Sequence, residues 1–105
     1  MTDFVVETGG DAPGVLAVSG ELDIATVDQF LAQARAALDT ASGVLVVDFG
    51  GVTFVDSTGL GSLVRLGNEA RRNGKHLDLV RVRREVRRVL DLTGLSEIFP
   101  DKTDH

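Results

Sequence analysis

Short apolar runs alternate along the chain with longer segments that mix polar and apolar residues. Two apolar runs, at 4–6 and 15–18, flank the turn-rich stretch TGGDAPG at 8–14. Such runs on either side of glycine and proline predict an N-terminal β-hairpin. The continuous run VLVVDF at 44–49 predicts a strand that is buried on both faces and ends in a turn. A further strand is predicted from His76 to Val82.

Three segments instead show the helical period, with apolar residues three and four positions apart. They predict one helix after Asp23, a second after Asp56 and a third at about 84–93. Asp23 or Thr26 could cap the first helix, and Thr26 with Gln29 has the spacing of a capping box. The residues expected to face inward are Val27, Phe30, Leu31, Ala34 and Leu38, then Leu60, Leu63, Val64 and Gly67, then Val86, Val89, Leu90 and Thr93, with Arg84, Arg87 and Arg88 facing solvent.

Strands that alternate with helices indicate an α/β fold with a hairpin added at the N-terminus. The length of 105 residues suits one domain spanning 1–105. Right-handed crossovers place successive strands side by side, and sites in such sheets lie at strand ends where helices begin. Asp23 and Asp56 both fall at strand-to-helix junctions, so we expect them to share one edge of the molecule.

Composition excludes several classes of site. The chain is 43% apolar, which allows a core, and it has no cysteine and only two histidines. A disulfide framework, a thiolate metal site and a histidine zinc site therefore have nothing to build on, and we expect no cofactor. No apolar run is long enough to span a bilayer, and the N-terminus lacks a basic start and an apolar signal core. We expect a cytoplasmic protein without a membrane partner.

Charge is distributed unevenly around a net charge of −5. Residues 1–64 contain nine acidic residues and one basic residue, whereas residues 65–105 contain ten basic and seven acidic residues. The acidic half argues against nucleic acid and is compatible with a cationic partner surface, although a solvated surface that keeps a small domain soluble is the preferred reading. The arginines at 81–88 have no interleaved aromatic residue, so we expect a solvated helix face and no nucleic acid.

The stretch FVDSTGLG, residues 54–61, combines three small polar residues with two glycines. Asp, Ser and Thr are preferred N-cap residues, but Gly59 and Gly61 should cost about 1 kcal/mol each relative to alanine in a helix. Either a partner comes close to the backbone here, or the helix packs too tightly against the sheet for a side chain. A hydroxyl at a helix N-terminus is also a good receptor for a phosphoryl group.

Enzyme readings of this stretch find little support. A hydrolase elbow needs glycine two residues before the serine, where this chain has Val55. A base is also lacking, because His76 is expected at the opposite end of the sheet. No glycine-rich loop precedes Gly74-Lys75, so there is no P-loop. We therefore expect no enzyme, and a small hydrolase or nucleotide-binding protein is the least favoured alternative.

Three segments together resemble the STAS domain of bacterial anti-sigma factor antagonists. They are GELD at 20–23, TFVDSTGLG at 53–61 and VLDLTGL at 89–95, and D-S-[ST]-G-L-G is the most specific part. The resemblance covers nearly the whole chain and implies a single STAS domain with a mixed sheet and packed helices. The family's final amphipathic helix is expected to be absent, because the sequence after Phe99 reads PDKTDH.

The resemblance also implies a mechanism of partner switching. In that family the serine after the aspartate is phosphorylated by a serine kinase that is itself the anti-sigma factor. The unphosphorylated antagonist binds this kinase and releases the sigma factor, and a phosphatase reverses the modification. Carried over, Ser57 is the phosphorylated residue. The partner-binding residues are then Asp23, Asp56, Ser57, Thr58, Gly59, Leu60 and Gly61.

One alternative within the same fold stays open. Some STAS modules are accessory subunits of transport systems or scaffolds of sensor complexes and are not phosphorylated. The serine after Asp56, in place of a residue without a hydroxyl, favours the antagonist.

Overall fold

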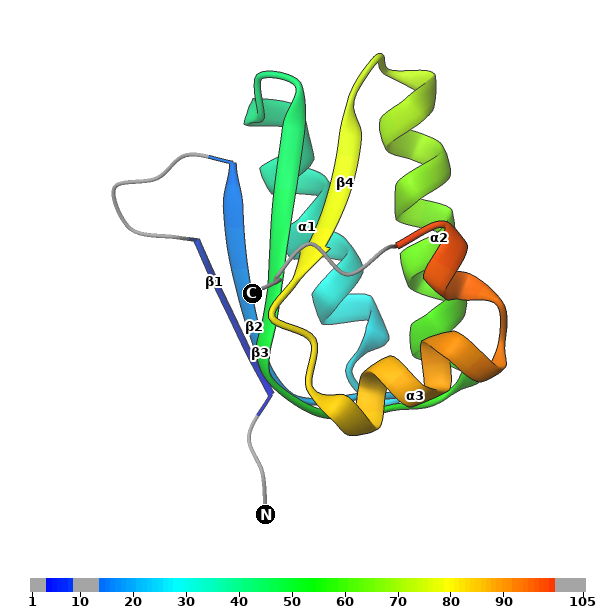
Figure 1. Cartoon of the computed structure of the whole chain (residues 1–105). Helices are drawn as coiled ribbons and strands as arrows, with labels where there is room; N and C mark the ends of the chain where they lie inside the picture. Colours follow the sequence, from blue (N-terminus) through cyan, green and yellow to red (C-terminus); the bar gives the residue numbers. More distant parts are fainter. Residues whose placement is uncertain (1–3, 9–13, 100–105) are drawn as a thin grey trace.

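The computed structural model describes residues 4–8 and 14–99, and its strands form one mixed four-stranded sheet (Figure 1). The strand order is β1-β2-β3-β4, with β1 and β2 antiparallel and the other pairs parallel. This confirms the predicted α/β fold with its N-terminal hairpin. The predicted turn at 8–14 falls mostly outside the described residues. The strands are β1 Val5–Thr8, β2 Val15–Leu22, β3 Val44–Val55 and β4 His76–Val80.

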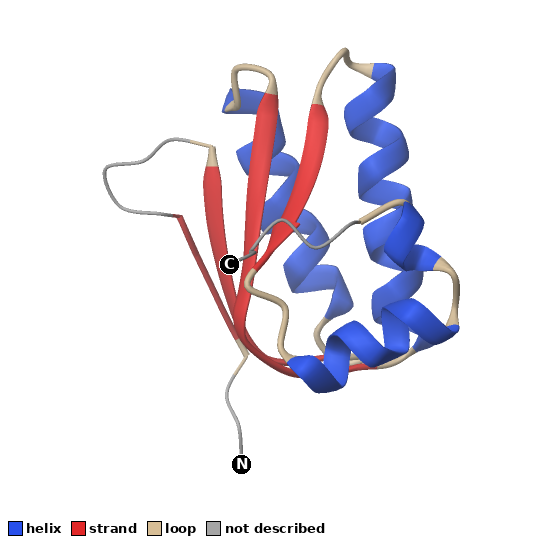
Figure 2. Cartoon of the chain, in the orientation of Figure 1, coloured by secondary structure: helices blue, strands red, loops and turns tan. Residues whose placement is uncertain are grey.

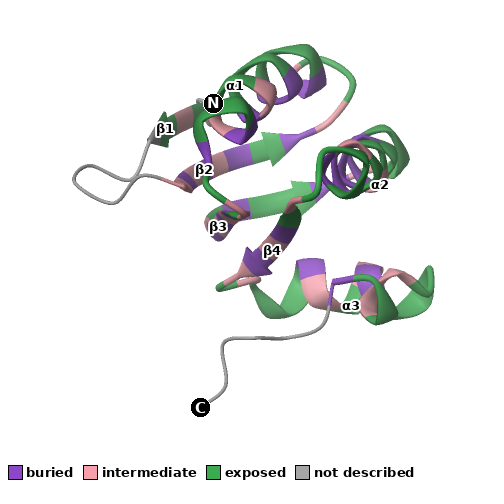
Figure 3. Cartoon of the chain, turned by 90° about the horizontal axis from the view of Figure 1, so that it is seen from above, coloured by how far each residue is buried: buried purple, intermediate pink, exposed green. Residues whose placement is uncertain are grey.

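Three α-helices follow the strands, as their periodicity predicted (Figure 2). The helices α1 and α2 lie on the same side of the sheet (Figure 3). The third helix, α3, lies at the end of the sheet where β3 runs on past β4 (Figure 1). The bounds are α1 Val27–Thr40, α2 Ser57–Arg72 and α3 Arg84–Leu92, followed by the short 3₁₀ helix η1 at Leu95–Glu97.

The longest strand, β3, corrects two predictions. It does not turn after Phe49 but continues to Val55, and it is not buried on both faces. Leu45, Val47 and Phe49 are fully buried, whereas Val44, the first residue of the strand, is 41% exposed. The reason is that α1 and α2 both cover one face of the sheet (Figure 3). The extension of β3 sets the position of α2, because α2 begins two residues after the strand ends.

The core lies between the sheet and α1 and α2. All five inward positions predicted for α1 are buried, and the rings of Phe30 and Phe49 meet edge to face with centroids 6.3 Å apart. In α3, Val86 and Leu90 are buried as expected. Thr93 is exposed, so its inward assignment is wrong. It lies just past the last residue of α3, where the helical period no longer sets the direction of a side chain.

Arg87 was predicted to face solvent, and that prediction is wrong. The residue is half-buried, the Nε and Nη2 atoms of its guanidinium are buried, and Nη1 donates a hydrogen bond to the carbonyl oxygen of Phe99 at 2.7 Å. Phe99 is itself only 2% exposed. The arginine therefore fastens the segment after η1 onto α3, a contact that helical periodicity cannot reveal. Up to Phe99 this segment contains only η1, and the rest of the predicted helix-free tail lies outside the described residues.

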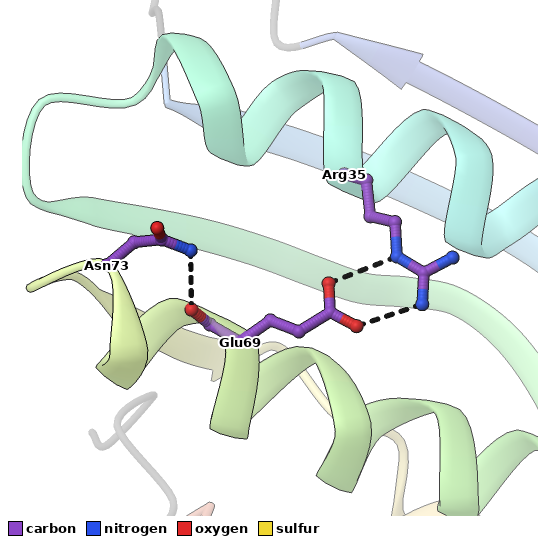
Figure 4. A network of polar contacts seen from close by, with 3 residues as sticks. All are labelled: Arg35, Glu69 and Asn73. Carbon is purple, nitrogen blue, oxygen red and sulfur yellow. Dashed lines mark hydrogen bonds and ion pairs between the residues drawn. The ribbon is translucent and has the colours of Figure 1, made fainter.

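An ion pair joins α1 to α2 (Figure 4). The guanidinium of Arg35 donates to both carboxylate oxygens of Glu69, at 3.0 and 2.9 Å, and Asn73 donates to the backbone carbonyl of Glu69. The hydrogen bond from Arg35 holds the pKa of Glu69 below its usual 4.5. Both side chains are partly exposed, so the pair stabilises the fold by less than about 1 kcal/mol. That contribution is present at neutral pH and is lost as the pH falls through the lowered pKa.

Across residues 4–8 and 14–99, no helix is long and apolar enough to cross a bilayer.

Candidate functional site

The polar stretch 56–58 forms the start of α2. Asp56 is the N-cap residue, and its carboxylate accepts a hydrogen bond from the backbone N–H of Gly59 at 2.9 Å. Capping is therefore done by Asp56. Ser57 and Thr58 follow in the first helical turn with exposed side chains. Neither hydroxyl has a hydrogen-bond partner among the described residues, so both are available to an external group.

The loop between β2 and α1 lies directly beside this helix start. The backbone N–H of Asp56 donates to the carbonyl oxygen of Leu22 at 3.2 Å, and Leu22 pairs with Val55 in the parallel register. Asp23 follows Leu22, so the structure places Asp23 and Asp56 at the same edge, as predicted. Parallel strands end together here, which explains why two loops far apart in sequence meet.

Internal hydrogen bonds hold this loop in one conformation. The carboxylate of Asp23 accepts from the N–H of Ala25 at 2.9 Å. The hydroxyl of Thr26 accepts from the N–H of Asp23 at 3.0 Å and donates to the carbonyl oxygen of Glu21 at 2.8 Å. Thr26 occupies the N-cap position of α1 but makes no side-chain cap bond, so the predicted capping box with Gln29 is wrong. Its hydroxyl is instead used to close the loop.

The two glycines of α2 have different reasons to be glycine. A Cβ atom on Gly59 would lie 2.7 Å from the carbonyl oxygen of Leu22 and 2.9 Å from Cγ1 of Val55. Gly59 is buried, so it allows α2 to pack on the ends of β2 and β3. Around Gly61, by contrast, nothing lies within 4 Å of such an atom and the residue is exposed. Tight packing of the helix against the sheet therefore explains the glycine at position 59. At position 61 packing gives no reason for a glycine, and close approach by a partner remains the explanation.

Burial narrows the set of partner-binding residues inferred from the resemblance. The side chain of Leu60 is only 8% exposed and belongs to the core, so we leave it out of the partner surface proposed below. It falls inward because it shares the buried face of α2 with Leu63. The side chains of Asp23 and Asp56 are half-buried, whereas Ser57, Thr58 and Gly61 are exposed. We call these five residues the α2 edge.

Two exposed apolar residues close to the α2 edge were missed by the sequence analysis. Ile24, in the loop after Asp23, is 77% exposed, and Phe54, near the end of β3, is 49% exposed. A signal for Ile24 was present, because a large aliphatic residue in a tight polar loop is not needed for the turn. Its exposure could not be foreseen, since Ile24 could equally have packed beneath α1.

The loop between β2 and α1 and the start of α2 carry acidic residues, whereas α3, which packs on β3, carries exposed arginines. Glu21, Asp23, Asp28 and Asp56 all lie in or beside the two loops. Arg35 is the one basic residue of the sequence between 14 and 64, and it is paired with Glu69 on the flank of the helices. A partner with a cationic surface would therefore be attracted to this edge.

We next consider metal ligands and a general base near the α2 edge. In the part of the chain that the structure describes, no cluster of three or more His, Cys, Asp or Glu side chains could hold a metal ion. His76 pairs with Val44 at the start of β3, whereas Ser57 follows the end of that strand. The imidazole is thus far from the Ser57 hydroxyl and cannot act on it as a general base.

The sequence of this chain is similar to those of known proteins. A family model described as "Mlab, STAS domain" matches residues 6–100. The anti-sigma-B factor antagonist of Staphylococcus epidermidis is 31% identical over 82 residues, which cover 78% of this chain and 76% of that protein.

Solved structures agree with these sequence matches. An anti-sigma factor antagonist from Mycobacterium paratuberculosis superposes with a TM-score of 0.76 at 30% identity, covering 96% of this chain and 85% of the other. The anti-sigma factor antagonist SpoIIAA, in its unphosphorylated form, superposes with a TM-score of 0.73 at 25% identity, covering 97% of this chain and 90% of the other. Both the sequence and the fold therefore lead to one conclusion: the chain belongs to the STAS domain family, as a distant member of the anti-sigma factor antagonists.

Proposed function

We propose that this protein is an anti-sigma factor antagonist controlled by phosphorylation of Ser57. In its unphosphorylated form it binds an anti-sigma factor that is a serine kinase, through the α2 edge, and so releases a sigma factor. The kinase phosphorylates Ser57 and thereby ends the interaction, and a serine phosphatase restores the binding form. The protein itself performs no catalysis in this scheme.

One observation carries the proposal: Ser57 is exposed at the capped start of α2, and its hydroxyl makes no hydrogen bond to residues 4–8 or 14–99. A kinase can reach it without unfolding the helix. Ser62, the next serine along, is only 3% exposed and donates its hydroxyl to the carbonyl oxygen of Gly59, so it is shielded. The relative SpoIIAA, which has been solved in unphosphorylated and phosphorylated forms, supports the same kind of switch.

The switch works by replacing the neutral hydroxyl of Ser57 with a negatively charged phosphate group. A phosphoserine adds between about 1.5 and 2 negative charges at neutral pH. The N–H groups and the dipole of α2 can stabilise this charge locally, so the fold need not change. A partner surface that accepted a neutral hydroxyl beside Asp56 would instead meet a bulky dianion and lose both fit and solvation.

The site of modification can be tested by mass spectrometry. We expect one phosphate on Ser57 after incubation with ATP and the purified anti-sigma factor kinase of the same organism. Ser57→Ala should remain unmodified, while the matched variant Thr58→Ala should be modified like the wild type, because both side chains are exposed and neither caps the helix. Phosphate on Thr58, or on the Ser57→Ala protein, would contradict the assignment.

The same experiment separates the alternative role. A STAS accessory subunit or scaffold would neither bind this kinase nor accept phosphate from it. Binding without modification would leave the antagonist role in place but remove phosphorylation of Ser57 as its control.

A further inference from the structure

Ile24 and Leu92 are the two most exposed large aliphatic residues among those that the structure describes, and Ile24 is the one in the loop that contains Asp23. It lies in the loop between β2 and α1, and 77% of it is exposed. Nothing in the folded chain gains from this exposure, because an aliphatic side chain in water is less favourable than a polar one at the same place. Single exposed apolar residues are common on protein surfaces, so the feature that distinguishes Ile24 is its position next to Asp23 in the α2 edge.

The loop presents Ile24 in a fixed orientation. The carboxylate of Asp23, before Ile24, accepts from the N–H of Ala25, after it. The hydroxyl of Thr26 accepts from the N–H of Asp23 and donates to the carbonyl oxygen of Glu21. A loop that is already ordered loses little conformational entropy on binding. Hydrogen bonds between the residues on both sides of Ile24 therefore order the loop backbone before a partner binds.

Ile24 is also continuous with the α2 edge. The carbonyl oxygen of Leu22, two residues earlier, accepts from the N–H of Asp56, which precedes Ser57. Glu21, Asp23 and Asp28 lie within four residues of Ile24 in the sequence, and Asp56 lies beside the same loop through its hydrogen bond to Leu22. An apolar centre with a charged rim is the arrangement found in interfaces where few residues carry most of the affinity.

We propose that Ile24 is the apolar anchor by which the anti-sigma factor recognises this protein, an inference that rests on the proposed function. The complementary site on the anti-sigma factor is an apolar pocket with a rim of basic side chains. Asp23 has two roles: its charge contributes to the acidic rim, and its carboxylate positions the loop by accepting a hydrogen bond from the N–H of Ala25.

The test compares two isoleucine-to-serine variants by calorimetric titration with the purified anti-sigma factor kinase. We expect Ile24→Ser to weaken binding at least about tenfold, the effect of losing an anchor residue. Ile98→Ser is the control, because Ile98 is 45% exposed and lines a surface pocket with Arg71 and His76, away from the α2 edge. We expect its affinity to stay within about twofold of the wild type.

Salt dependence distinguishes the anchor from the acidic rim. The loss caused by Ile24→Ser should persist at high salt, because apolar burial is not screened, whereas losses of charge are reduced there. Asp23→Asn, whose amide oxygen can still accept from the N–H of Ala25, should therefore approach the wild type at high salt. Asp23→Ala, which frees the loop, should remain weaker.

Ser57→Glu, measured in parallel, separates failure of this inference from failure of the proposed function. If Ser57→Glu weakens binding but Ile24→Ser, with an unchanged melting temperature, binds like the wild type, then Ile24 is not the anchor and the antagonist role stands. Should Ile24→Ser lose stability, Ile24→Ala takes its place in the same comparison. If the wild-type protein does not bind the kinase at all, the proposed function itself is overturned, and this inference with it.

Discussion

Ser57→Glu is expected to bind the anti-sigma factor about 100-fold more weakly than the wild type, while the free protein keeps its fold. The side chain of Ser57 is exposed and makes no hydrogen bond among the described residues, so its replacement removes nothing from the folded state. At the interface the new carboxylate lies beside Asp56 and must be desolvated. Unfavourable charge placement of this kind costs several kcal/mol, and each 1.4 kcal/mol is a factor of ten in affinity.

Ser57→Gln is the matched control for charge. Glutamine has nearly the same size and shape as glutamate but carries no charge, so we expect its affinity to lie much closer to that of the wild type. Calorimetric titration of both variants with the purified anti-sigma factor measures the difference. Equal weakening by Gln and Glu would mean that steric exclusion, and not charge, controls the interface.

Gly59→Ala is expected to destabilise the protein by about 3 kcal/mol, at the upper end of what overpacking usually costs. The added methyl group would lie 2.7 Å from a backbone oxygen of Leu22 and 2.9 Å from Cγ1 of Val55, and the strand backbone cannot move aside easily. Relief would require the start of α2 to lift from the ends of β2 and β3. The intrinsic preference of helices for alanine, about 1 kcal/mol, works in the opposite direction and is too small to compensate.

Gly61→Ala provides the contrast two residues further along the same helix. No atom lies within 4 Å of the new methyl group, so we expect an increase in stability of up to about 1 kcal/mol. Urea denaturation of both variants measures the two changes. If Gly59→Ala were as stable as the wild type, the close packing of α2 on Leu22 would be contradicted. Because Gly61→Ala keeps the fold, any loss of its affinity for the partner would report a close approach at this position.

Local patterns in the sequence were enough to predict the elements. The three-and-four spacing of apolar residues in α1 predicted its buried face correctly, and glycine and proline marked the hairpin. A cap within Asp56-Ser57-Thr58 was recognisable, because all three residue types accept from the first helical N–H groups, and the structure shows that Asp56 is the one that does so. The candidate edge could also be located, since strand-to-helix junctions of parallel strands lie at the same end of a sheet.

What could not be predicted depends on which element packs against which. The VLVVDF run looks the same whether one or both faces of a strand are covered, so the open face of β3 had to come from the structure. Gly59 and Gly61 are indistinguishable in sequence, although only Gly59 meets a neighbouring strand. Arg87 follows the polar period of α3, but its partner is a backbone carbonyl twelve residues later. Each of these errors concerns a contact between segments distant along the chain.

The most direct test of the central claim is a competition between the anti-sigma factor's two partners. The purified anti-sigma factor is first bound to its sigma factor, and release of the sigma factor is measured on titration with either the unphosphorylated protein or the protein carrying phosphate on Ser57. The account predicts that the unphosphorylated protein releases the sigma factor and that the phosphorylated protein does not. Equal release by both forms would contradict it.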